Sequence, residues 1–117
     1  LIKMKRLCDD RQIRFLVVLI PDETQVNSGL QSQVIRAANL PGDAYDFARP
    51  NRVVTEALSA HHIDALDCLD EFARAASQTN LYKPNDGRWN IAGNKLAADL
   101  IARHLSPGLA GAATGGN

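Results

Sequence analysis

The sequence predicts an α/β protein, specifically part of a three-layer α/β/α sandwich with a short parallel sheet. Residues 13–20 read IRFLVVLI, and a strand that is apolar almost throughout is usually covered on both faces. This strand and a shorter one at 63–66 alternate with helical patterns, which is typical of parallel strands joined by right-handed crossovers. Because two strands are too few for a stable sheet, the sequence predicts about half of such a domain.

The helices before the second strand are predicted from apolar residues three or four positions apart, which form one helix face. These helices span residues 1–11, 30–39 and 50–60. Pro21 ends the first strand because proline cannot donate to the ladder, and residues 21–28 should form a loop at the carboxyl end of that strand. Ligands bind at this edge in open α/β sheets.

The second half is expected to contain a short helix over 67–76, a loop over 77–87 and a final helix. Asn90 suits the N-cap position of this final helix, because its side chain can accept from free amides of the first turn. Pro107 and Gly108 are expected to end the helix. This divides the chain into a domain at 1–106 and a disordered tail at 107–117.

Composition argues against two classes of partner. The 117 residues contain 13 Lys plus Arg and 13 Asp plus Glu, so the formal net charge is zero. Nucleic-acid-binding domains usually carry a basic excess or a basic stripe, and neither is present, so no nucleic acid partner is expected. No apolar run is long enough for a membrane span. The chain begins with Leu1 in what reads as the middle of a helix, so we expect residues upstream of it.

The two cysteines, Cys8 and Cys68, do not form a disulfide framework and are best interpreted as packing thiols. Neither cysteine takes part in a metal-ligand spacing, so no metal site is predicted. No Gly-rich phosphate loop opens a helix, which argues against an unrelated flavodoxin-like nucleotide module. We therefore expect no cofactor.

The most informative stretch is LYKPNDGRWNIAGNKLAADLIARHL at 81–105, a polar loop that leads into an amphipathic helix. It contains Asp86-Gly87-Arg88-Trp89-Asn90, followed by Ala92-Gly93 and Leu96-Ala97-Ala98. This stretch resembles the last sequence block of the SGNH (GDSL-type) esterase and acyltransferase superfamily, a common form of which is Asp-Gly-His-Trp-Asn. The resemblance is sharp over about fifteen residues. The strand at 13–20 and the sequence IDALD also resemble the later half of that flavodoxin-like fold.

The resemblance implies acyl transfer through a serine nucleophile, with a His as general base and an Asp that orients it. Asp86 matches the orienting Asp. The substrate would be an ester of a small molecule or a glycan. The resemblance places the nucleophilic Ser and the oxyanion-hole Gly and Asn in blocks upstream of Leu1. We therefore expect the chain to be the C-terminal part of the domain, whose N-terminal half is its partner.

Arg88 occupies the position of the family His. A guanidinium stays protonated at any relevant pH and has no lone pair, so it cannot accept a proton from serine. It can pair with Asp86 or bind an anion. Without a serine block and with Arg88 at this position, the chain is expected to lack esterase activity. The alternative function is a non-catalytic module of the same fold that binds carbohydrate or a partner protein.

The three histidines are poor substitutes for the missing base. His61 and His62 end a helix at the amino end of the second strand, opposite the expected site. His104 lies roughly four turns along the last helix and is expected at the surface.

Several site residues also have structural interpretations. Asp86 is equally well explained as a turn former in Asn-Asp-Gly. Trp89 is better explained as a core plug, a side chain that fills the core between the last helix and the sheet, than as a surface against which a substrate binds. Asn90 and Asp22 are further candidates for substrate binding, although Asp22 is more simply explained as part of a solvated loop.

Overall fold

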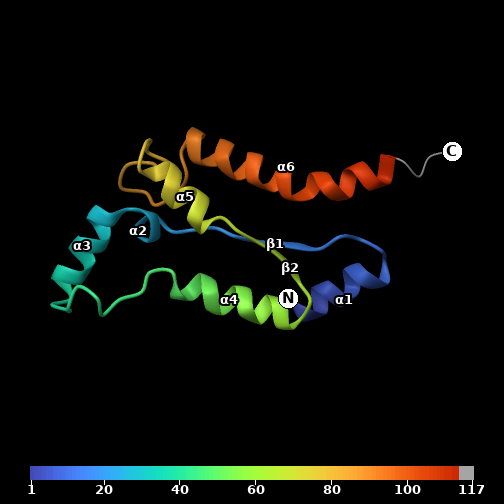
Figure 1. The fold of residues 1–117 in the computed structure, drawn as a ribbon, viewed down its shortest axis with the longest axis horizontal. Helices are drawn as coiled ribbons and strands as arrows, with labels where there is room; N and C mark the ends of the chain where they lie inside the picture. Colours follow the sequence, from blue (N-terminus) through green and yellow to red (C-terminus); the bar gives the residue numbers. More distant parts are fainter. Residues whose placement is uncertain (114–117) are drawn as a thin grey trace.

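The computed structural model describes the backbone of residues 1–113 and the side chains of residues 1–106. Helices and strands alternate along the chain (Figure 1). In order, the elements are α1 (Ile2–Asp10), β1 (Leu16–Leu19), α2 (Glu23–Val26), α3 (Ser28–Ala37), α4 (Arg49–Ala60), β2 (Asp64–Asp67), α5 (Leu69–Ala76) and α6 (Ile91–Ala113). The expected α/β class with a short parallel sheet is confirmed.

The two strands pair in parallel, with Leu16 opposite Asp64 and Leu19 opposite Asp67. Within residues 1–113 the sheet has these two strands. The backbone N–H of Cys68 donates to the carbonyl of Leu19 at 3.2 Å, which continues the pairing one step beyond the ladder. The carboxyl ends of both strands therefore meet at one edge of the sheet.

Helices lie on both sides of the sheet (Figure 1). α4 contacts β2 on one side, where Leu58 and Ile63 are buried. On the other side, Val18 and Leu66 pack against the main core cluster from α5, α6 and the loop between them. The side chains of β1 are half-buried, so the expected full cover of this strand on both faces is not reached within the described residues.

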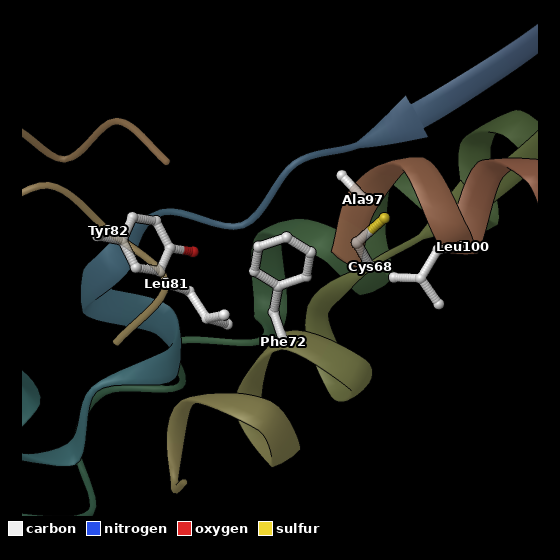
Figure 2. Close-up of a cluster of buried hydrophobic side chains, with 6 residues drawn as sticks. All are labelled: Cys68, Phe72, Leu81, Tyr82, Ala97 and Leu100. Atoms are coloured by element: carbon white, nitrogen blue, oxygen red, sulfur yellow. The ribbon is translucent and has the colours of Figure 1, made fainter. Parts of the chain in front are cut away.

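The main core cluster surrounds Phe72 of α5, which is fully buried (Figure 2). Ala97 and Leu100 reach it from α6 and Leu81 and Tyr82 from the preceding loop, while Cys68 completes it. Cys68 is a free, fully buried thiol whose pKa is raised, first by burial and then by the nearby Asp67 carboxylate. This confirms its interpretation as a packing thiol.

Two elements differ from the sequence prediction. Residues 21–28 were expected to be a loop, but Asp22 forms a capping box with Gln25 that starts α2. The last helix was expected to end before Pro107, but α6 continues to Ala113. Residues 107–113 contain three Ala and one Leu, whose high helix propensities favour continuing the helix past Pro107 and Gly108. The expected tail is therefore helical over 107–113, and residues 114–117 lie outside the described part of the chain.

The molecule is open for its size. Its radius of gyration is 17.5 Å, against about 13 Å for a single domain of this length. Its accessible surface is 8349 Å², against roughly 6,200 Å² for a folded monomer of this mass. Among the described residues, no helix combines the length and apolar character needed to cross a membrane.

Candidate functional site

The loop before α6 is attached to the carboxyl end of β1. The hydroxyl of Tyr82 donates to the carbonyl of Pro21 at 3.0 Å, two residues beyond the end of the strand. Tyr82 also forms an antiparallel bridge with Trp89, which closes residues 83–88 into a projecting turn. The expectation that Asp86 and Arg88 lie at the carboxyl end of the first strand is therefore confirmed.

The projecting turn has a tight backbone. Lys83 N–H donates to the carbonyl of Arg88 at 2.7 Å, and Asp86 N–H donates back to Lys83 at 3.3 Å. Asn85 and Gly87 both adopt positive φ angles, of 58° and 64°. Gly87 accommodates such an angle at no steric cost, while Asn is the residue other than Gly that tolerates it best. The turn thus explains Asn-Asp-Gly as local geometry and brings Asp86 alongside Arg88.

Asp86 and Arg88 form a two-pronged ion pair. Arg88 Nε donates to Asp86 Oδ1 at 2.7 Å and Nη2 donates to Oδ2 at 2.9 Å. The hydrogen bond from Arg88 lowers the pKa of the Asp86 carboxyl, and the same bond raises the pKa of Arg88. The Arg88 side chain remains 76% exposed. The Asp86 carboxylate is thus paired with the guanidinium of Arg88, which is permanently charged and cannot accept a proton.

Trp89 lies under the loop and packs on Phe72, with ring centroids 4.9 Å apart. It also contacts the first turn of α6, because a Cβ built on Gly93 would lie 3.0 Å from Trp89 Cβ. The indole Nε1 is buried and has no hydrogen-bond partner within the described part of the chain. These contacts support the expectation that Trp89 is mainly a core plug.

Tyr82 is held in the same packed region. Burial raises its pKa to about 12, and the carboxylates of Asp22 and Glu23 act in the same direction. The nearby N–H of Trp89 acts to lower the pKa of Tyr82 and so limits this rise, although the two side chains do not form a hydrogen bond. Tyr82 therefore keeps its proton and acts as the donor to Pro21.

Asn90 caps α6 as expected. Its Oδ1 accepts from Gly93 N–H at 3.0 Å, and its Nδ2 donates to the carbonyl of Asn80 at 2.7 Å. Both ends of the amide are therefore used to join the helix to the loop. Asn90 positions Trp89 and Arg88 rather than offering a free group to a ligand.

A hollow of about 440 Å³ opens beside the ion pair. It lies where the end of β1 faces the projecting turn and the first turns of α6. The residues that line it are Ile20, Lys83, Gly87, Arg88, Trp89 and Asn94. Two cationic side chains at one rim favour a ligand group that is negative or rich in acceptors.

Asp22 is not part of this hollow. Its carboxylate accepts from Thr24 N–H at 2.8 Å as the cap of α2, and it faces a separate hollow near Tyr45 and Phe47. The structure thus brings Asp86, Arg88 and Trp89 together and places Asp22 elsewhere, in a structural role.

The histidines lie away from Asp86. His61 is the C-cap of α4, at the amino end of β2, as expected. His104 has a partner that the sequence did not reveal, because its Nε2 lies 2.9 Å from Asp64 Oδ1. Arg14 binds the other oxygen of Asp64 at 3.1 Å. This cluster joins α6 to the amino edge of the sheet, so His104 is engaged at the opposite edge from the candidate site.

A second polar network was also missed. Asn51, which is buried, donates to Asp67 at 2.7 Å and accepts from Gln25 at 2.8 Å. It joins α4, β2 and α2 at the carboxyl edge of the sheet. The sequence signal was an Asn inside an apolar helical pattern, one position after Pro50.

No metal-binding group of three or more His, Cys, Asp or Glu side chains occurs among the described residues. Comparison of the chain with protein-family models, with curated proteins and with solved structures finds no match.

Proposed function

We propose that the chain is the C-terminal part of an SGNH-like (GDSL-like) ester hydrolase or O-acyltransferase domain with a three-layer, flavodoxin-like sandwich. In this proposal the chain is inactive as it stands, because Arg88 occupies the position of the catalytic His. The observation that carries the proposal is the two-pronged contact between Asp86 and Arg88 at the carboxyl end of β1.

The geometry of this contact supports the proposed ancestry. In a Ser-His-Asp arrangement, the Asp holds the residue at the His position and fixes its orientation. Asp86 holds Arg88 in the same way, two residues along the same turn. A guanidinium can be oriented by the carboxylate but cannot act as the base, so the orienting contact survives without the proton transfer.

Exposed apolar surface supports the idea that further chain completes the domain. A hollow of about 520 Å³ lies between α1 and α4, and most of its lining side chains are apolar. Exposed apolar side chains around it include Leu1, Ile2 and Val53. A two-stranded sheet also leaves backbone groups unpaired at its outer edges. The missing half of the domain would add strands at an edge of this sheet and cover this apolar surface.

The substrate class of the parent domain would be an ester of a small molecule or a glycan. The hollow beside Arg88 is open to solvent and combines Lys83 and Arg88 with the side chain of Ile20. Such a site suits a polar, oxygen-rich ester better than a long acyl chain.

The second candidate function is a non-catalytic module that binds carbohydrate or a partner protein and uses Arg88 as an anion contact. The observation that favours it is the 76% exposure of the Arg88 side chain, next to Lys83. An exposed pair with Asp86 contributes little to folding, so Arg88 remains available to a ligand carboxylate.

The decisive experiment measures hydrolysis of p-nitrophenyl acetate by the longest natural chain that contains this sequence, unchanged and with Arg88→His. If the proposal holds, the unchanged chain is silent and Arg88→His gains activity, which Asp86→Asn then reduces. Arg36→His, on an exposed part of α3, is the matched control and should remain silent. If Arg88→His is folded and silent, either the upstream nucleophile is also absent or the resemblance is to the fold alone, and the binding module becomes the better assignment.

A further inference from the structure

A second hollow lies on the other side of the 81–90 loop, between the junction of α2 with α3 and the end of α5. Its volume is about 370 Å³, within the range of small-ligand sites in proteins. Besides Tyr82, whose hydroxyl is bonded to Pro21, the polar side chains that line it are Glu23, Asn27, Ser28, Ser77, Thr79 and Asn80. It shares none of its lining residues with the hollow beside Arg88.

Two amide groups in this hollow are fixed in direction by their own oxygen atoms. Asn27 Oδ1 accepts from Gly29 N–H at 3.0 Å and from Leu30 N–H at 3.2 Å. Asn80 Oδ1 accepts from Tyr82 N–H at 3.1 Å. Because the oxygens are anchored, each NH₂ group is held in place as a donor before any ligand arrives, which lowers the entropy cost of binding.

Acceptors and hydroxyls complete the lining. In the described part of the chain, the side chains of Glu23, Ser28 and Thr79 make no hydrogen bond within the protein. A carboxylate accepts only, whereas a hydroxyl both donates and accepts. The hollow thus offers fixed donors, one strong acceptor and two adaptable hydroxyls, which is the complement of a ligand with several hydroxyl groups.

Charge and apolar surface narrow the ligand class. Among the described residues, Glu23 is the one charged residue in the lining, and no Lys or Arg lines this hollow. A phosphate or a uronic acid would therefore meet a carboxylate without any cation to balance its charge. Val26, Ala73 and Ala76 supply a small apolar surface, which suits the C–H face of a sugar ring.

We propose that this hollow binds a neutral sugar residue of a glycan. The anchored amides of Asn27 and Asn80 donate to ring hydroxyls, Glu23 accepts from them, and the side chains of Ala73 and Ala76 contact the ring. The inference goes beyond the proposed function, because it needs neither the serine block nor any chemistry at Arg88.

The test is an NMR titration of the ¹⁵N-labelled chain with cellotetraose, maltotetraose and mannotetraose, with inorganic phosphate and galacturonic acid as anionic probes. We expect at least one neutral tetrasaccharide to give saturable shifts, at millimolar concentration, that are centred on the amides of residues 27–28 and 79–80. The anionic probes should leave these amides unchanged.

Two variants separate binding in this hollow from binding elsewhere. Ala73→Phe, at an exposed position of α5, should fill the hollow and weaken binding at least about tenfold. Ala98→Phe, at an exposed position of α6 that lines no described hollow, is the matched control and should bind normally. The double variant Ser28→Ala/Thr79→Val removes two hydroxyls without internal partners and should weaken binding by about fivefold or more.

Three outcomes would overturn the proposal. The first is the absence of saturable shifts with any neutral tetrasaccharide. The second is equal affinity of the parent chain and of both hollow variants, folded as judged by their spectra. The third is phosphate binding that shifts the same amides. None of these outcomes affects the esterase test, which reads out only at Arg88.

Discussion

Gly93 lies so close to the carbonyl oxygen of Leu81 that a Cβ at position 93 would stand 2.3 Å from it. The same Cβ would be 3.0 Å from Cβ of Trp89. The absence of a side chain therefore lets the first turn of α6 sit directly on the 81–90 loop. This contact fixes the position of the loop relative to α6, and the loop in turn places Arg88 at the end of β1.

Replacing this glycine should damage the site and the fold together. We expect Gly93→Ala to lower the free energy of unfolding by about 2 kcal/mol or more, because backbone must move to admit the methyl group. Gly42→Ala is the matched control, because nothing lies within 4 Å of its Cβ position. Urea unfolding followed by circular dichroism measures both. Equal stability of the two variants would mean that α6 and the loop are not in close contact.

The local parts of this architecture could be predicted from sequence. The apolar run in β1 and the Asn90 cap depend on neighbouring residues, and both are confirmed. The α2 helix was missed, although Asp22 and Gln25 have the spacing of a capping box, because four residues carry no periodic signal.

Contacts between distant positions could not be predicted in the same way. Asp86 and Arg88 are two positions apart, so their pairing was foreseeable once a turn was expected. The bond from Tyr82 to Pro21 spans 61 positions, and its existence depends on how the loop folds over the sheet. No periodicity encodes such a contact, and a single sequence offers no covariation to reveal it.

The orienting ability of Asp86 can be measured without any enzyme activity. In Arg88→His, the introduced imidazole should lie beside the Asp86 carboxylate, which favours the charged ring and raises its pKa above the ordinary value of about 6.5. The rise should be less than about one unit, because the turn is exposed to solvent. ¹H–¹⁵N spectra of the side chains across the pH range give this pKa directly.

The sign of the accompanying stability change follows from this rise. A His whose pKa is raised in the folded state stabilises the fold at pH values below its pKa in the unfolded chain. This stabilisation is lost as the pH rises through the pKa of the His in the folded state. The double variant Arg88→His/Asp86→Asn should return the imidazole to an ordinary pKa. An imidazole that titrates identically in both variants would show that Asp86 does not hold the residue at position 88.

Asp64 should contribute to stability in mild acid. Partial burial raises the pKa of Asp64, but the hydrogen bonds from His104 and Arg14 outweigh burial, and the pKa lies below its ordinary value. A lowered carboxyl pKa gives stability that is present above the unfolded value and lost as the pH falls through the folded value. Asp64→Asn should therefore flatten the fall in stability below about pH 4.

The measurement for Asp64 is urea unfolding at a series of pH values from neutral into acid. Asp43→Asn is the matched control, since Asp43 is exposed and takes part in no ion pair within the described residues. It should follow the acid dependence of the parent chain. If the free energy of unfolding of Asp64→Asn falls in acid with the same slope as that of the parent chain, the link between α6 and the sheet does not form in solution.

Two residues one turn apart in α4 should respond in opposite ways to loss of a polar group. In the part of the chain that the structure describes, the Thr55 hydroxyl is buried without a hydrogen-bond partner, whereas Asn51 is bonded to both Asp67 and Gln25. Thr55→Val removes an unpaired group and keeps the side-chain shape, so the free energy of unfolding should stay equal or rise by up to about 1 kcal/mol. Asn51→Leu leaves Asp67 and Gln25 without that partner and should cost about 1–3 kcal/mol. Urea unfolding at neutral pH compares the two, and a loss of stability in Thr55→Val would show that its hydroxyl has a partner, such as an ordered water molecule.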